Sequence, residues 1–263
     1  MHAYLSRDGV VPRRFLELSR HEVLKYPQVR FVKAEVRTAK RQGTRFEVRL
    51  GDRQRVRCRK LLIATGVYDL LPPVRGIEAL YGRSVFQCPY CDGWEMRGTR
   101  VAVYGRGQRG LQMARAMTAW ASDLVLCTDG RAKYSPADRR ALLRNGITVI
   151  EKPIAELRGS RGRLRAVVFQ DGDTLARDSL FFDTPSRNQS KLAESLGCQF
   201  NHKGGVICGE YEATSVPGVF VAGNIIRDVQ LSIVAAAEGA RAAFGINRAL
   251  TREDFDARAN SAR

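Results

Sequence analysis

The stretch VAVYGRGQRG, residues 101–110, decides the fold of this chain. Residues 100–104 predict a buried strand, and Gly105, Gly107 and Gly110 follow as a G-x-G-x-x-G turn at the start of a predicted helix. Small residues there let the backbone approach a pyrophosphate, while the helix N-terminus supplies N–H donors and positive potential. The pattern predicts a dinucleotide-binding unit, and the alternative is a tight turn that binds nothing.

The end of the next predicted strand, residues 123–128, indicates which nucleotide this unit would bind. Asp129 follows, where an acid accepts a hydrogen bond from the ribose 2′-hydroxyl of NAD and repels a 2′-phosphate. Arg131 and Lys133 stand just beyond and would attract such a phosphate. NADH and NADPH therefore both stay open as partners.

Outward from this unit, strands alternate with helices, which is typical of an α/β sheet with a nucleotide site at its strand ends. One helix is clearly marked, with Ser135 as N-cap, Pro136 at the first position and Gly146 at the end. QDGD at residues 170–173 predicts a hairpin turn. The predicted helices are 13–25, 108–121, 135–146, 191–196 and 231–250, and the predicted strands are 29–36, 45–50, 55–63, 100–104, 123–128, 147–151, 163–170, 179–182 and 219–222.

Two further strand ends lie outside this unit. The predicted strand that ends at residue 63 leads into ATGVYDLLPP, where Thr65 and Gly66 let the backbone bend sharply and approach a ligand. A second buried strand in TSVPGVFVAGN, residues 214–224, ends at Gly223, and a helix of small residues follows. This repeats the strand-to-helix arrangement and predicts a site for another anionic cofactor; an ordinary strand–turn–helix is the alternative.

The segment FQCPYCDGWE, residues 86–95, holds a C-x-x-C pair, Cys88 and Cys91, followed at once by Asp92. Such a pair can be half of a zinc site, a structural turn or a redox-active dithiol. None of the other four cysteines forms a second C-x-x-C, and the pair lies shortly before Gly105, in the same domain as a hydride carrier. The redox dithiol is therefore favoured. Asp92 would protonate a leaving thiolate, and its alternative is a solvated turn residue.

Composition bears on nucleic-acid binding, metal binding and secretion as further classes of function. The chain has 263 residues and a net charge of +17, from 44 basic and 27 acidic residues. The basic residues are scattered, so no specific nucleic-acid partner is predicted. His2, His21 and His202 lack metal-ligand spacing, so no metal site is predicted. No signal peptide or membrane span is recognised, and six cysteines in this length do not make a secreted disulfide framework, so a cytoplasmic location is expected.

In their order, these motifs resemble one known family. The chain resembles the low-molecular-weight thioredoxin reductases over roughly residues 4–250. These are class II pyridine nucleotide-disulfide oxidoreductases. The motifs that carry the resemblance are, in order, ATG, C-x-x-C-D-G, G-x-G-x-x-G and T-x-x-P-G-V-F-x-A-G-(D/N), followed by a small-residue helix. CPYCDGWE is similar to the thioredoxin-reductase-like branch, which includes dithiol oxidases of natural-product pathways. The resemblance implies an α/β fold with two Rossmann-like FAD- and NAD(P)-binding domains of three-layer ββα type. It implies an FAD domain at 1–76 and 209–250 and a pyridine-nucleotide domain with the cysteines at 77–208. By composition, residues 251–263 form a polar tail.

The resemblance also implies roles for single residues. Cys91 would be the flavin-proximal sulfur, Cys88 would exchange with the substrate, and Asp92 would be the acid. Electrons would pass from NAD(P)H through FAD to the disulfide and then to a small disulfide or a thioredoxin-like protein, in a homodimer. In a dithiol oxidase they would run the other way, to flavin and then to oxygen. The matching cofactor positions are Thr65, Gly66, Gly223, Asn224 and Gln230 for FAD, and Gly105, Gly107 and Gly110 for NAD(P)H. Asp129 and Arg131 are added as nucleotide-binding positions from the strand end alone.

The chain departs from the family pattern at three places. It has one G-x-G-x-x-G, so we expect an N-terminally truncated FAD domain without its first βαβ unit and main phosphate cradle. Asn224 stands where Asp is usual, and Val229 replaces the usual Arg beside Gln230. CTDGRAK replaces the basic H-R-R cluster that reads the NADPH phosphate. An oxygen-using dithiol oxidase and a nucleotide-binding remnant without catalysis therefore stay open as alternatives.

Overall fold

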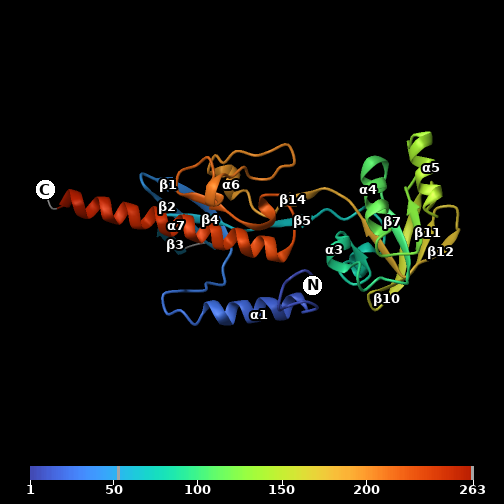
Figure 1. Cartoon of the computed structure of the whole chain (residues 1–263), viewed down its shortest axis with the longest axis horizontal. Coiled ribbons are helices and arrows are strands. Elements are labelled where there is room, and N and C mark those ends of the chain that lie inside the picture. Colours follow the sequence, from blue (N-terminus) through green and yellow to red (C-terminus); the bar gives the residue numbers. More distant parts are fainter. Residues whose placement is uncertain (52–53, 262–263) are drawn as a thin grey trace. The chain divides into compact units, whose positions relative to one another are not determined.

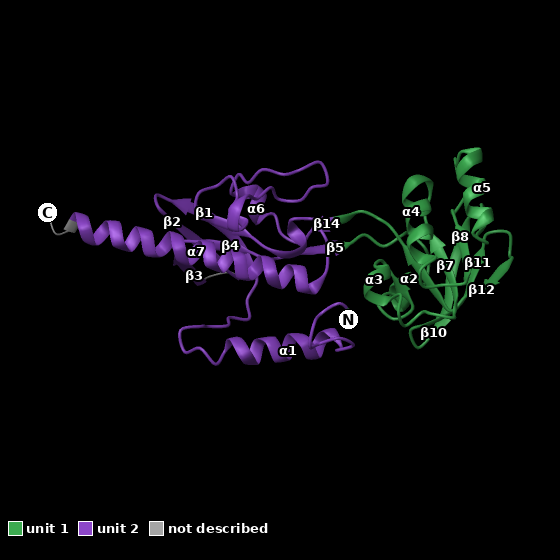
Figure 2. Ribbon diagram, viewed as in Figure 1, with its two compact units in different colours: residues 1–2, 69–186 green, residues 3–68, 187–263 purple. Residues whose placement is uncertain are grey.

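The chain folds into two compact units, each built from two separate stretches of sequence (Figures 1 and 2). The computed structural model describes residues 1–51 and 54–261. Unit 1 comprises Met1–His2 and Asp69–Ser186, and unit 2 comprises Ala3–Tyr68 and Arg187–Arg263. Each unit has a hydrophobic core of its own.

A five-stranded parallel sheet forms the centre of unit 1, in the order β6-β13-β7-β8-β9. Its strands are apolar and are covered on both faces, as parallel sheets require. Two short helices, α2 (Ile77–Leu80) and α3 (Pro89–Asp92), flank the first strand in the sequence. The five strands are β6 (Val85–Phe86), β7 (Arg100–Tyr104), β8 (Asp123–Cys127), β9 (Thr148–Ile150) and β13 (Ser179–Phe182).

Successive residues of these strands point into two different cores, because side chains alternate across a sheet. Val101 and Val103 pack with residues of α4 (Gly107–Met117) and α5 (Pro136–Arg144). Ala102 packs instead with residues of an antiparallel sheet, whose strands are β10 (Ile154–Ser160), β11 (Arg163–Phe169) and β12 (Thr174–Ala176). Unit 1 therefore has three layers, helices, parallel sheet and antiparallel sheet, which is the predicted ββα arrangement.

Unit 2 combines an antiparallel sheet with a short parallel pair of strands. Strands β1 (Val36–Gln42), β2 (Arg45–Leu50) and β3 (Gln54–Cys58) form the antiparallel sheet, and β4 (Leu61–Ile63) pairs in parallel with β15 (Val219–Val221). Phe46, Ile63 and Val221 lie in their shared core. The other elements are the helices α1 (Pro12–Val23), α6 (Leu192–Ser195) and α7 (Ser232–Ser261), the 3-10 turns η1 (Glu210–Glu212) and η2 (Gly223–Ile225), and the paired strands β5 (Val67–Asp69) and β14 (Ser186–Asn188).

Two of the predicted strands differ from the structure. The strand predicted at 29–36 is wrong for residues 29–35, which are not assigned to a strand; the pairing of β1 with β2 begins at Val36, opposite Leu50. The strand predicted at 55–63 is two strands. β3 pairs with β2 whereas β4 pairs with β15, so the chain changes partner at Arg59 and Lys60. Alternation of apolar residues cannot show where a partner strand ends.

The helix predicted at 231–250 is longer in the structure, because α7 continues to Ser261 and so includes residues 251–261 of the predicted polar tail. Polar side chains of this helix find partners. Glu253 pairs with Lys60, Asp254 pairs with Arg59, and Arg252 lies 3.9 Å from Asp256 one helical turn on. Residues 262–263 lie outside the described part of the chain.

The boundaries between the units after residues 68 and 186 differ from the predicted domain boundaries after residues 76 and 208. Residues 69–76 lie in unit 1, where Val74 is buried in the core beside the antiparallel sheet. Residues 187–208 lie in unit 2, where Leu192 and Val206 are buried. The burial of these side chains shows which unit each segment belongs to. The two prolines at residues 72–73 do not mark the boundary, although a proline pair is typical of a linker.

Candidate redox and cofactor sites

Cys88 and Cys91 are joined by a disulfide, with a Cα–Cα distance of 5.3 Å. Cys88 is the N-cap of α3, and its sulfur accepts a hydrogen bond from the Cys91 N–H at 3.1 Å. A donor aimed at sulfur favours the thiolate once the disulfide is reduced. Both cysteines are half-buried and Tyr90 between them is exposed, so the pair lies at the surface of unit 1. This arrangement favours the redox interpretation over the zinc interpretation.

The edge of the parallel sheet positions this pair. Strand β6 ends at Phe86, whose ring lies beside that of Phe181 on the neighbouring β13, with ring centres 5.3 Å apart. Gly93 follows α3 and packs against Trp120: a Cβ on this glycine would lie 2.8 Å from Cγ of the indole ring. Since real Cβ atoms do not approach so closely, only glycine fits there. The redox pair is thereby held between a strand end and the contact of Gly93 with the half-buried Trp120.

Asp92 directly follows the disulfide and is half-buried. Burial raises its pKa to about 6, and the nearby negative charge of Glu95 acts in the same direction. A general acid works best when its pKa lies near the working pH. Tyr81 lies in the same electrostatic environment: its hydroxyl donates to Asp69, and its pKa is raised by burial, by this hydrogen bond and by the charges of Asp69 and Asp92. Asp92 therefore has the character of a proton donor.

The three glycines of the predicted dinucleotide site lie between β7 and α4. Gly105 and Gly110 pack backbone to backbone, since a Cβ on Gly110 would lie 2.5 Å from the carbonyl carbon of Gly105. Gly107 has a φ of 55°, which glycine adopts more readily than other residues. The turn therefore has the close strand-to-helix packing that a pyrophosphate-binding loop requires.

Asp129, predicted to bind the nucleotide ribose, is engaged by the protein itself. Its Oδ1 accepts from the Ile154 N–H at 2.8 Å, and its Oδ2 accepts from the Tyr104 hydroxyl at 3.2 Å. Arg106, which the sequence analysis missed, lies across the same strand end. Its Nε donates to the Thr128 carbonyl at 2.7 Å, and its Nη2 lies 3.5 Å from Asp129 Oδ2. The position of Arg106 between Gly105 and Gly107 was the sequence signal that could have identified it as a site residue.

A hollow of about 690 Å³ follows β8 and is lined by the predicted Arg131 together with Lys133 and Arg139. Arg139 is also paired with Glu151, with 2.7 Å between its Nη2 and the carboxylate. Tyr134 lines the same hollow, and its buried hydroxyl has no hydrogen-bond partner. This surface fits an anionic group such as a nucleotide phosphate. The sequence analysis did not predict Arg139 and Tyr134 as site residues, because neither belongs to a recognisable motif.

In unit 2, the segments predicted to contact FAD follow two neighbouring parallel strands. β4 and β15 pair in register, so Thr65 and Gly66 leave the sheet beside Gly223 and Asn224, at the carboxyl edge where such sheets bind ligands. The hydroxyl of Thr65 is buried and has no hydrogen-bond partner. A buried unpaired hydroxyl is costly unless a ligand satisfies it, so these residues fit a bound cofactor.

The amide of Gly223 is engaged by a side chain that the sequence analysis missed. Its N–H donates to Glu238 Oε2 of α7 at 2.6 Å. Burial raises the pKa of this carboxyl. Gln230, predicted to contact FAD, is exposed. A carboxyl group of α7 therefore already engages the backbone N–H at the turn after β15.

These motifs and their placement occur together in a known family. The model of the family described as pyridine nucleotide-disulphide oxidoreductase matches residues 14–239. The chain belongs to this family.

The relatives of this pyridine nucleotide-disulphide oxidoreductase include named thioredoxin reductases. Thioredoxin reductase tcpT of Claviceps purpurea (strain 20.1) is 29% identical over 238 residues, covering 85% of this chain and 73% of the relative. The crystal structure of HlmI is 32% identical with a TM-score of 0.94, and the match covers 100% of this chain and 83% of that one. The putative thioredoxin reductase TrxB from Bacillus anthracis is 30% identical with a TM-score of 0.91, covering 96% and 85%. These matches confirm the predicted Rossmann-type fold and a thioredoxin-reductase-like enzyme.

The predicted site residues of this oxidoreductase are divided between the units. The redox pair, Asp92 and the glycine turn lie in unit 1, whereas Thr65, Gly66, Gly223, Asn224 and Gln230 lie in unit 2. Across residues 1–51 and 54–261, no three His, Cys, Asp or Glu side chains are placed to hold a metal ion. No helix in that part of the chain is both long enough and apolar enough to cross a membrane.

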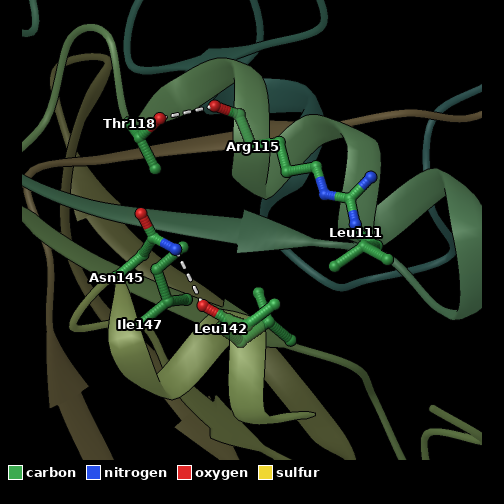
Figure 3. A pocket seen from close by; sticks show the side chains of 7 residues that line it. Leu111, Arg115, Thr118, Leu142, Asn145 and Ile147 are labelled. Carbon is green, nitrogen blue, oxygen red and sulfur yellow. Dashed lines mark hydrogen bonds between the residues drawn. The ribbon is translucent and has the colours of Figure 1, made fainter. Parts of the chain in front are cut away.

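One cavity of the oxidoreductase contains none of the predicted site residues. It has a volume of about 80 Å³ and lies between α4 and α5 (Figure 3). Two of the side chains there bond to the backbone of their own helix: the Thr118 hydroxyl donates to the Arg115 carbonyl, and the Asn145 amide donates to the Ala141 carbonyl. The lining residues are Leu111, Arg115, Thr118, Ala141, Leu142, Asn145 and Ile147.

Proposed function

We propose that this protein is an FAD-dependent NAD(P)H:disulfide oxidoreductase in which Cys88 and Cys91 form the redox disulfide. The observation that carries the proposal is the half-buried disulfide directly before Asp92, whose pKa is raised. The same unit contains the glycine turn, and the family match adds the reaction class.

Thr65, Gly66, Gly223, Asn224 and Gln230 would hold the FAD. The unpaired Thr65 hydroxyl and the adjacent turns after β4 and β15 support this assignment. Bound FAD would supply two-electron transfer to and from the disulfide. Gly105, Gly107 and Gly110 would bind the pyrophosphate of the pyridine nucleotide, and Asp129 and Arg131 would lie near its ribose.

The chemistry of the protein's own residues is thiol–disulfide exchange. In the reduced protein, the Cys88 thiolate attacks one sulfur of the substrate disulfide and breaks its S–S bond. Asp92 gives its proton to the departing thiolate, which leaves as a thiol. The Cys91 thiolate then attacks the Cys88 sulfur, which restores the Cys88–Cys91 disulfide and releases the second substrate thiolate. Two electrons pass from the protein dithiol to the substrate.

The substrate class is a small disulfide or dithiol, or a thioredoxin-like protein. Tyr90, 65% exposed, and Trp94, 51% exposed, lie beside the disulfide and offer aromatic surface for such a substrate. Relatives named thioredoxin reductases support the protein substrate. We also propose a homodimer, which light scattering after size-exclusion chromatography tests directly.

One observation favours a second function, an oxygen-using dithiol oxidase. Arg106 lies across the strand end where a nucleotide ribose would bind, and both Asp129 oxygens accept hydrogen bonds from the protein. In this reaction a substrate dithiol becomes a disulfide, and its two electrons and two protons convert oxygen to hydrogen peroxide. Cys88 and Cys91 perform the same exchange in the opposite direction.

The deciding experiment adds NADH, NADPH or dithiothreitol anaerobically to the FAD-loaded protein and follows the flavin absorbance. Bleaching by a nicotinamide supports the first function; bleaching by dithiol alone, with oxygen uptake when air is admitted, supports the second. If FAD binds and no donor bleaches it, or if FAD does not bind, the proposal is overturned.

A pair of variants assigns the chemistry to the cysteines. Cys88→Ser abolishes disulfide exchange while flavin stays bound. Cys58→Ser, a half-buried cysteine on β3, leaves exchange unchanged. Exchange at the normal rate in Cys88→Ser would remove Cys88 from the mechanism.

A further inference from the structure

The side chain of Arg106 runs from the glycine turn to the carboxyl end of the neighbouring strand β8. Its Nε donates to the Thr128 carbonyl at 2.7 Å, and its Nη2 lies 3.5 Å from Asp129 Oδ2. Gly130 lies against the same guanidinium, since a Cβ on this glycine would be only 3.1 Å from Nη2. The backbone of Arg106 is fixed as well: it is the N-cap residue of α4, and its carbonyl accepts from the Gly110 N–H at 3.4 Å.

The carboxylate of Asp129, beside this guanidinium, is used by the fold of unit 1. Its Oδ1 accepts from the Ile154 N–H at 2.8 Å, and its Oδ2 accepts from the Tyr104 hydroxyl at 3.2 Å. The turn that carries it is also held, because Thr128 Oγ1 donates to the Gly130 carbonyl at 2.6 Å. Binding of a nucleotide ribose requires an acid at this strand end to accept from a sugar hydroxyl. The strand end with Arg106 in this place therefore does not fit a ribose.

We propose that Arg106 is a specificity-determining residue that occupies the position of the nucleotide ribose and so weakens pyridine nucleotide binding at the glycine turn. In dinucleotide-binding units the ribose lies beside the acid that ends the second strand, which is where this guanidinium lies. A nucleotide enters only after Arg106 leaves the Thr128 carbonyl and Asp129. The inference rests on the proposed function, because the glycine turn is the pyridine nucleotide site there.

The contacts of Arg106 also set the size of the effect. Its side chain is 60% exposed, so water replaces part of the bonding that is lost when the guanidinium leaves the strand end. The apparent affinity of a ligand falls in proportion to the fraction of molecules whose site is open. With about one molecule in ten open, nucleotide binding is about tenfold weaker than at a permanently open site. Arg106 thus disfavours a nicotinamide donor without abolishing its binding.

Calorimetric titration of the full-length protein with NAD⁺ tests this inference. NAD⁺ cannot reduce a flavin, so the readout does not depend on turnover. Arg106→Ala should bind NAD⁺ about tenfold more tightly than the wild type, because the strand end is open in every molecule. Arg115→Ala removes the same charge near the other end of α4 and should leave the affinity unchanged. If Arg106 only stabilised the turn, its removal would weaken NAD⁺ binding or leave it unchanged, and either result overturns the inference.

A second variant serves if alanine disturbs the turn. Arg106→Gln has a shorter, uncharged side chain and should also bind NAD⁺ more tightly. Tryptophan fluorescence during urea unfolding shows whether unit 1 stays folded in each variant, since Trp94 and Trp120 both lie there.

Failure of the inference and failure of the proposed function are distinguishable. Equal NAD⁺ affinities in the wild type, Arg106→Ala and Arg106→Gln overturn the inference, whatever the flavin assay shows. A bound flavin that neither a nicotinamide nor a dithiol bleaches overturns the proposed function, whereas tighter NAD⁺ binding in Arg106→Ala would still support the inference.

Discussion

The tightest backbone contact at the predicted nucleotide turn provides a quantitative prediction for Gly110→Ala. The new Cβ would lie 2.5 Å from the Gly105 carbonyl carbon and 2.9 Å from the Tyr134 hydroxyl, whereas ordinary contacts begin at 3.4 Å. The chain must therefore open by about 1 Å at a site where both neighbours are backbone or buried, which costs about 1–3 kcal/mol. Unit 1 should lose that much stability.

The assay uses the two tryptophans of the chain, Trp94 and Trp120, which both lie in unit 1. Tryptophan fluorescence during urea unfolding therefore reports the stability of this unit, and its midpoint should fall by about 1 M in Gly110→Ala. Gly239→Ala is the control: a Cβ there meets no atom within 4 Å, and the residue lies on α7 of unit 2. A Gly110→Ala midpoint equal to that of the wild type or the control would refute the packing argument.

Two further predictions concern unit 1 and use the same fluorescence assay. Ser135 Oγ accepts a hydrogen bond from the Asp138 N–H at 3.1 Å at the start of α5. Ser135→Ala should therefore lower the free energy of unfolding by about 1 kcal/mol, while Ser135→Asn retains most of the stability. Equal losses in both variants would contradict the capping role. Hydrogen bonds from Arg100 lower the pKa of Asp178 to about 2, so the pair stabilises the fold above about pH 4 and the effect is lost as pH falls toward 2. Asp178→Asn should flatten the loss of urea midpoint between pH 4 and 2, and an unchanged slope would exclude this contribution.

Elements whose signals are local were predicted well. The helix after Ser135 begins and ends where its cap, proline and glycine indicate, since those signals act within one turn. The glycine turn after β7 has the expected place for the same reason. Errors arose where an element depends on a distant partner: the pairing of β1 with β2 begins only at Val36, and residues 251–261 stay helical with ion pairs to Arg59 and Lys60.

The residues of the candidate site also separate into those placed by local sequence and those placed by contacts between distant parts of the chain. Sequence alone places Cys88, Cys91, Asp92 and the three glycines close together, because C-x-x-C-D and G-x-G-x-x-G bring their atoms together through bonds and turns of a few residues; the roles of these residues stay predictions. The folded chain was needed to show Asp129 bonded to Ile154, Glu238 on the amide of Gly223, and His2 against Glu95. Those contacts join residues that are 25, 15 and 93 positions apart. Which of them meet depends on strand order and packing, and no spacing in the sequence encodes it.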